Sequence, residues 1–135
     1  VNLSEPQILK EEFSAFGTMH FKETALKVTF SDQVRDFSLQ VNECQVEDER
    51  LELILQDEFY PFRIHLFYEV FPEADLIRRW SSAENTGSEP IVIERFCSAQ
   101  FGLPGTGYTS LNYNGRWGAE FLEQSDPVTV GKKGL

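Results

Sequence analysis

The sequence predicts an all-β protein with the fold of an antiparallel β-sandwich. Three observations support this: polar and apolar residues alternate with a period of two, no segment has helical periodicity, and turn sequences separate the apolar segments. Alternation gives each strand one buried face and one wetter face, as in antiparallel sheets. Roughly eight short strands at this spacing are typical of a sandwich.

The predicted strands follow one another with short connections. In the clearest of them, residues 62–70, the side chains of Ile64 and Leu66 share one face, and those of Arg63 and His65 share the other. In chain order, the predicted strands are 26–30, 37–41, 51–56, 62–70, 76–82, 91–101 and 108–113.

Turn sequences divide these strands. Residues 71–75 contain a proline, and residues 85–90 read Asn-Thr-Gly-Ser-Glu-Pro, where glycine permits a positive φ and proline fixes its own. The alternation of the following strand slips near Arg95, where we expect a β-bulge. The dipeptide Asn114-Gly115 favours a hairpin, and we expect the chain to turn there.

The composition is that of a folded domain with an acidic surface. The 135 residues are 41% hydrophobic and 25% charged, which suits a domain with its own core. The net charge of −10 repels phosphate backbones and anionic lipids, so we expect neither nucleic acid nor a membrane as a partner. We expect residues 1–135 to form a single β-sandwich domain or a fragment of one.

The cysteines and histidines indicate neither a metal centre nor a disulfide framework. Cys44, Cys97, His20 and His65 lack the spacing of a zinc site, and two cysteines are too few to staple a domain of this length. We therefore expect no metal, no cofactor, two mostly buried free thiols and two incidental histidines. The sequence also contains no apolar run long enough to cross a membrane.

Several stretches together resemble one known family. Residues 66–79 form a strand, an acidic turn and an arginine-bearing strand; residues 84–90 add the Asn-Thr-Gly loop, and residues 91–95 add an apolar strand. With Asn-Gly-Arg-Trp at 114–117, they resemble the N-terminal domain of the α-galactosidases of glycoside hydrolase family 36. The likeness covers at least residues 16–131. It departs from the family pattern at Lys22, Thr24, Ala119 and Ser81-Ser82-Ala83.

The resemblance implies that the chain is part of a larger supersandwich domain, truncated at both ends. It implies a bacterial, cytoplasmic and oligomeric parent enzyme, in which a separate (β/α)8 barrel hydrolyses terminal α-galactosides such as melibiose and raffinose by a retaining mechanism. That barrel, which carries a Lys-Trp-Asp nucleophile motif in the family, would be the partner of this domain. A barrel needs about 250 residues, and Lys-Trp-Asp is absent from the sequence. We therefore expect no catalytic residue in this chain.

A few residues are candidates for sugar binding. Trp117 follows a turn, and Arg116 beside it can stack on its ring as a cation–π pair, which favours a structural clamp over a sugar platform. Trp80 is more typical of a core residue. Glu73 and Asp75 resemble the carboxylate pair of a glycosidase, but solvated turn residues fit their position better. We expect the same of Asp57, Glu58 and Asp32.

The polar residues of the wet sheet face are expected to pair across strands. Arg78 and Arg79 would form a charge network with Glu84 and Glu94.

Two alternatives to the α-galactosidase domain remain open. The first is a free-standing carbohydrate-binding module, which needs two or three aromatic residues on one exposed face; Tyr108 and Trp117 are available for this role. The second is a structural sandwich without a role in sugar binding.

Overall fold

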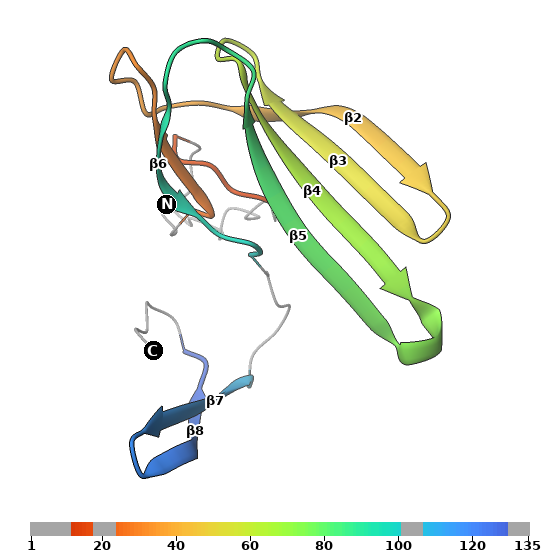
Figure 1. The fold of residues 1–135 in the computed structure, drawn as a ribbon, viewed down its shortest axis with the longest axis vertical. Helices are drawn as coiled ribbons and strands as arrows, with labels where there is room; N and C mark the ends of the chain where they lie inside the picture. The colour runs from red at the N-terminus through yellow and green to blue at the C-terminus, as the bar shows by residue number, and fades with distance from the viewer. Residues whose placement is uncertain (1–11, 18–23, 101–106, 130–135) are drawn as a thin grey trace, which may run out of the picture. The chain divides into compact units, whose positions relative to one another are not determined.

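Figure 1 shows a computed structural model of the protein, which describes residues 12–17, 24–100 and 107–129. Apart from a short 3-10 turn at Pro72–Ala74, every regular element in these ranges is a β-strand, so the predicted all-β fold is confirmed. The chain divides into two compact units, Val1–Phe101 and Gly102–Leu135, and each is described by itself. The strands are β1 (Leu26–Thr29), β2 (Leu39–Glu47), β3 (Arg50–Asp57), β4 (Phe62–Phe71), β5 (Leu76–Asn85), β6 (Val92–Phe96), β7 (Thr109–Arg116) and β8 (Ala119–Pro127).

Four strands of the first unit form one antiparallel sheet in the order β2-β3-β4-β5 (Figure 1). Each strand pairs with the next one in the chain, because the connections between them are short turns. In the register, Leu53 lies opposite Leu66, and Phe67 lies opposite Trp80. The β4–β5 turn ends at Asp75, whose φ of +50° lies in the left-handed region.

A second sheet, made of β1 and β6, covers one face of the four-stranded sheet, which we call the inner face. Leu26 and Val28 of β1 are fully buried and belong to the same hydrophobic cluster as Phe62, Ile64 and Leu66 of β4. Two antiparallel sheets that enclose one core make a β-sandwich, as the sequence predicted.

Aromatic side chains fill one end of this core. The rings of Phe30, Phe37 and Phe62 meet edge to face, with centroids 5.8–6.1 Å apart. Tyr60 stacks on Phe30 with its ring centroid 3.7 Å away. Such contacts add to the burial of apolar area, so this cluster is a main source of the stability of the first unit.

The bulge expected near Arg95 is confirmed, but the strand that carries it is shorter than predicted. Lys27 pairs with Arg95 and Val28 with Ile93, so Glu94 is the extra residue in β6. The strand ends at Phe96 rather than at residue 101. After it, the Cys97 N–H donates to the Ala25 carbonyl at 2.8 Å.

The second unit is the β7–β8 hairpin, and its turn is not where the sequence predicted it. Gly115 lies within β7, and the chain reverses at Trp117-Gly118, between the paired residues Arg116 and Ala119. Gly118 has a φ of +77°, which only glycine adopts without strain. A bulge next to the turn places two residues of β8 opposite Gly115, and one of them, Phe121, has a φ of +56°.

Candidate functional site

The face of the four-stranded sheet that points away from the core, here called the outer face, carries ordered rows of polar and aromatic side chains. Because antiparallel strands align residue against residue, paired side chains on the same face form rows across all four strands. The aromatic row consists of Gln45, Glu52, Phe67 and Trp80; the charged row beside it consists of Glu47, Arg50, Glu69 and Arg78.

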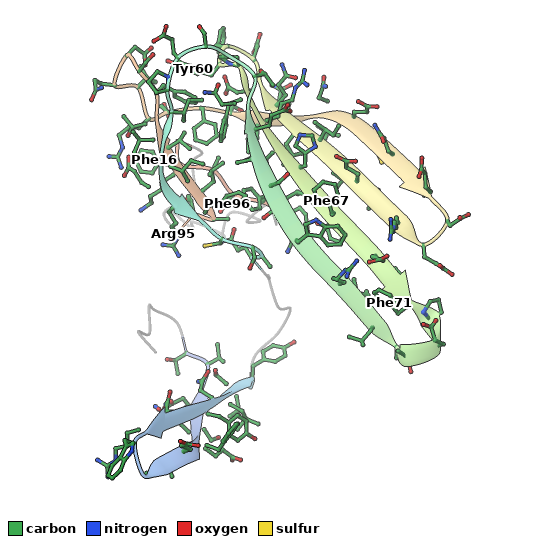
Figure 2. The ribbon with its side chains drawn as sticks, viewed as in Figure 1. Phe16, Tyr60, Phe67, Phe71, Arg95 and Phe96 are labelled. Carbon is green, nitrogen blue, oxygen red and sulfur yellow. The ribbon has the colours of Figure 1, made fainter. Side chains whose placement is uncertain are left out.

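The aromatic row contains stacked rings, and Figure 2 labels Phe67 of β4. Phe67 lies parallel to Trp80, with a centroid distance of 5.0 Å and an interplanar angle of 11°. His65 is also nearly parallel to Phe67, at 6.1 Å. Trp80 is therefore not the core residue that the sequence suggested: it lies on the outer face and is 37% exposed. Its alternation with Arg78, Ser82 and Glu84 was the sequence signal for this position.

The charged row is held together by a buried carboxylate. Glu69 is 8% exposed and accepts hydrogen bonds from two arginines of the flanking strands. Arg50 donates from Nε to Oε1 at 2.9 Å, and Arg78 donates from Nη2 to Oε2. The hydrogen bond from Arg50, with the positive charges of both guanidinium groups, lowers the pKa of Glu69.

Arg78 also joins the charged row to the aromatic row. Its guanidinium carbon lies 4.9 Å from the centroid of the Trp80 ring, a cation–π contact. Arg78 is thus held by a carboxylate and by an aromatic ring at the same time, which restricts its orientation on the sheet.

A groove lies between the two rows. Its volume is about 330 Å³, and its lining combines the rings of Phe67 and Trp80 with the polar groups of Gln45, Glu52 and Arg50. The groove thus offers aromatic surface, hydrogen-bond donors and hydrogen-bond acceptors side by side.

His65 is not the incidental residue that the sequence suggested. Its Nδ1 lies 2.6 Å from Oε1 of Glu52, and its Nε2 lies 3.3 Å from Oε2 of Glu84. It therefore links the β3 and β5 carboxylates across β4. Among the described residues, no cluster of His, Cys, Asp or Glu side chains is suited to hold a metal ion. His20 lies outside the described residues.

The predicted network of arginines and glutamates has different partners. Arg78 pairs with Glu69, while Arg79 points to the inner face, where its Nη2 lies 2.8 Å from Oε1 of Glu12. Glu12 also accepts a hydrogen bond from Tyr68; burial of the hydroxyl, together with this bond, raises the pKa of Tyr68 to about 12. The prediction was wrong because neighbouring residues of a strand point to opposite faces.

The two sequence candidates of the hairpin do not form the predicted pair. Trp117 is fully exposed at the tip of the turn, and among the described residues its ring makes no cation–π contact with Arg116. Tyr108 and Tyr113 belong to the same unit and are also exposed. The hairpin therefore exposes aromatic side chains but lacks the predicted clamp.

For three of the acidic residues that were predicted to be solvated turn residues, the structure confirms the prediction at two and corrects it at the third. Glu73 and Asp75 lie in the exposed β4–β5 turn, as expected. Asp57 is buried, and its oxygens accept backbone N–H groups of Ser38, Phe59 and Tyr60 at 2.7–2.9 Å. An aspartate used in this way organises the β3–β4 turn.

The thiols differ from the expectation in one respect. Both cysteines are free, but Cys44 of β2 is exposed, whereas Cys97 packs against the core. No helix among the described residues has the length and apolar character needed to span a membrane.

Comparison with known families identifies the domain. The glycosyl hydrolase family 36 N-terminal domain matches residues 2–135. The chain belongs to this family. Probable α-galactosidase G of Aspergillus terreus (strain NIH 2624 / FGSC A1156) is 34% identical over 81 residues, which cover 60% of this chain and 11% of the relative. The bifunctional α-galactosidase/sucrose kinase AgaSK of Mediterraneibacter gnavus is 25% identical over 141 residues, which cover 91% of this chain and 15% of the relative.

Solved structures of family 36 enzymes share the fold. The α-galactosidase AgaA of Geobacillus stearothermophilus superimposes with a TM-score of 0.82 at 23% identity, over 90% of this chain and 20% of that one. The α-galactosidase of Lactobacillus brevis gives a TM-score of 0.81 at 23% identity, over 89% and 19%. Variants of AgaA have been solved with raffinose and with stachyose. The family 36 domain described here thus spans about a fifth of the enzymes that it matches.

Proposed function

We propose that this chain is a non-catalytic piece of the N-terminal domain of an α-galactosidase. The observation that supports this most directly is the family match over residues 2–135, together with relatives that are named α-galactosidases. In this proposal, residues 1–135 form a fragment of one supersandwich domain, and the parent is a bacterial, cytoplasmic homo-oligomer.

Hydrolysis is assigned to a separate (β/α)8 barrel of the parent. Terminal α-galactosides, such as melibiose and raffinose, are its proposed substrates, and a retaining mechanism is its proposed chemistry. The role of the family 36 domain is to pack against that barrel and to take part in subunit contacts. The surroundings of Asp57 support this division, because that carboxylate is already occupied by backbone N–H groups.

Turnover of a chromogenic α-galactoside tests the proposal. The parent protein is expected to hydrolyse it, and the 135-residue chain alone is expected to show no activity above buffer. The matched control is the parent with its barrel nucleophile, the aspartate of a Lys-Trp-Asp motif downstream of residue 135, changed to asparagine. Activity of the isolated chain that survives repurification and is lost on mutation of one of its carboxylates would refute the division of labour.

A further inference from the structure

Two arginines beside the groove on the outer face are held in place by a buried carboxylate of the same sheet. Buried Glu69 accepts hydrogen bonds from both Arg50 and Arg78, whose side chains are themselves 69% and 58% exposed. A guanidinium group has five N–H donors. Arg50 uses Nε and Nη2, and Arg78 uses Nη2, so both retain N–H groups without a partner among the described residues.

The groove also has hydrogen-bond acceptors. Glu52 shares its Oε1 with His65, and its second oxygen has no hydrogen-bond donor among the described residues, so it can accept from a ligand. Glu47 lies at the other edge of the groove, and the amide of Gln45 has both a donor and an acceptor. Donors and acceptors therefore surround the same space.

The charges around the groove nearly balance. Glu47, Glu52 and Glu69 supply three negative charges against the two positive charges of Arg50 and Arg78, which leaves −1. The chain as a whole carries −10. An anionic ligand would meet this field unfavourably, whereas a neutral ligand pays no such cost.

The aromatic wall adds an apolar requirement. Trp80 is 37% exposed beside Phe67, so the ligand must have C–H surface as well as hydroxyl groups. The volume of about 330 Å³ lies at the lower end of the range of small-molecule sites, about 300–1,000 Å³. These properties together describe a short neutral saccharide.

We propose that the groove between the aromatic row and the charged row of the outer face is a saccharide-binding site. Trp80 and Phe67 provide the apolar wall. Arg50 and Arg78, oriented by Glu69, donate hydrogen bonds to sugar oxygens, and Glu52 accepts from sugar hydroxyl groups. The inference does not rest on the proposed enzymatic function.

Tryptophan fluorescence of the 135-residue chain tests this site. The chain has two tryptophans, so Trp117→Phe leaves Trp80 as the only reporter. We titrate this variant with raffinose, sucrose and cellobiose, and with sodium sulfate as an anionic probe. A saturable change in Trp80 emission with a saccharide, at a dissociation constant on the order of millimolar, is the expected result. Sulfate is expected to produce none.

Two arginine variants in the same background locate the binding. Arg78→Gln is expected to weaken saccharide binding about tenfold or more, because it removes both the charged donor and its contact with Trp80. Arg116→Gln, the matched control on the hairpin, is expected to bind the saccharide as strongly as Trp117→Phe alone. If circular dichroism shows that Arg78→Gln is unfolded, Gln45→Ala at the edge of the groove takes its place and is also expected to weaken binding.

Three results would overturn the proposal. The first is the absence of a saturable signal with every saccharide up to about 100 mM. The second is equal competition by sulfate, which would make the groove an anion site. The third is loss of binding in Arg116→Gln, which would move the site to the hairpin. None of these results affects the proposed enzymatic function, because turnover by the parent tests that separately.

Discussion

Arg35 and Glu94 form a two-point ion pair between a loop and the bulge of β6. Arg35 donates from Nε to Oε1 at 2.9 Å and from Nη2 to Oε2 at 2.6 Å. The hydroxyl of Thr29 donates to the same Oε1 at 2.5 Å. The pair explains the bulge: the extra residue in the strand is the one whose carboxylate joins β1, β6 and the loop that follows β1.

This arrangement predicts a pH dependence of stability. Hydrogen bonds from Thr29 and Arg35 lower the pKa of Glu94 in the folded protein. As the pH falls, the unfolded chain, with an ordinary glutamate pKa of about 4.3, therefore takes up this proton first. The contribution of Glu94 is thus complete above that value and is lost as the pH falls through the lowered folded value. In urea titrations from pH 7 to pH 3, the free energy of unfolding of Glu94→Gln should fall less on acidification than that of the unsubstituted 135-residue chain.

Two partner variants serve as controls for this pH dependence. Thr29→Val removes one of the hydrogen bonds that lower the pKa of Glu94, and Arg35→Gln removes the two that the guanidinium group donates. Both should reduce the acid sensitivity in part. If the free energy of unfolding changed with pH equally in the unsubstituted chain and in Glu94→Gln, the proposed stabilisation by the Glu94 carboxylate would be contradicted.

Two isoleucines of neighbouring strands test where the core lies. Ile64 of β4 is fully buried under the second sheet, whereas Ile77 of β5, at an inward position of the same inner face, is 66% exposed. Ile64→Ala should lower the free energy of unfolding by about 2–5 kcal/mol, because it leaves a cavity. Ile77→Ala should change it by less than about 0.5 kcal/mol. Chemical denaturation measures both changes. Similar losses in the free energy of unfolding would mean that the inner face is also covered at Ile77, which the structure does not show.

Two glycines of the hairpin test the position of its turn. Gly118 has a φ of +77°, so Gly118→Ala should destabilise the hairpin by about 1 kcal/mol. At Gly115, an added Cβ meets its nearest neighbour, the Cα of Glu120, at 3.5 Å, which is an ordinary contact. Gly115→Ala should therefore be close to neutral. Cross-strand nuclear Overhauser effects between β7 and β8 report the hairpin population, and the reverse order of sensitivity would return the turn to Asn114-Gly115.

The two cysteines should react at different rates. Cys44 is exposed on β2, while Cys97 packs against the core and lies 3.4 Å from Nε of Arg95. In the folded chain, an aromatic disulfide reagent should label one thiol rapidly and the second slowly; in denaturant it should count two. Cys44→Ser should abolish the rapid phase. A total of zero thiols would show a disulfide and would argue for an oxidising compartment.

The open part of the inner face predicts self-association of the isolated chain. Val46, Val70 and Ile77 occupy inward positions but are exposed, and the outer edges of β2 and β5 have no neighbouring strand in the described sheet. Sedimentation over a wide concentration range should show oligomers. Ile77→Lys should shift the equilibrium toward monomer, whereas the control Trp117→Lys, at an exposed position of the hairpin, should not. A clean monomer at high concentration would favour a self-contained module.

Local pattern indicated β1 to β7, but it did not indicate β8, which no predicted strand covers. A strand repeats every two residues, so the alternation around Ile64 indicated a buried face. The same alternation places Trp80 on the outer face, although we predicted a core position for it because most aromatic residues of a sandwich are buried. The slip of this pattern near Arg95 was enough to locate the bulge. The same alternation, applied strictly, separates Arg78 from Arg79.

Partners across strands depended on the tertiary structure. Glu69 meets Arg50 and Arg78 because the registers of β3 and β5 bring them together, and residues 19 and 9 positions apart carry no local sign of that pairing. The extent of the core was decided in the same way: Ile64 and Ile77 have equal hydrophobicity and equivalent inward positions, but the second sheet covers only the first. Hydrophobic burial depends on which surface another element covers, and that is a property of the assembled chain.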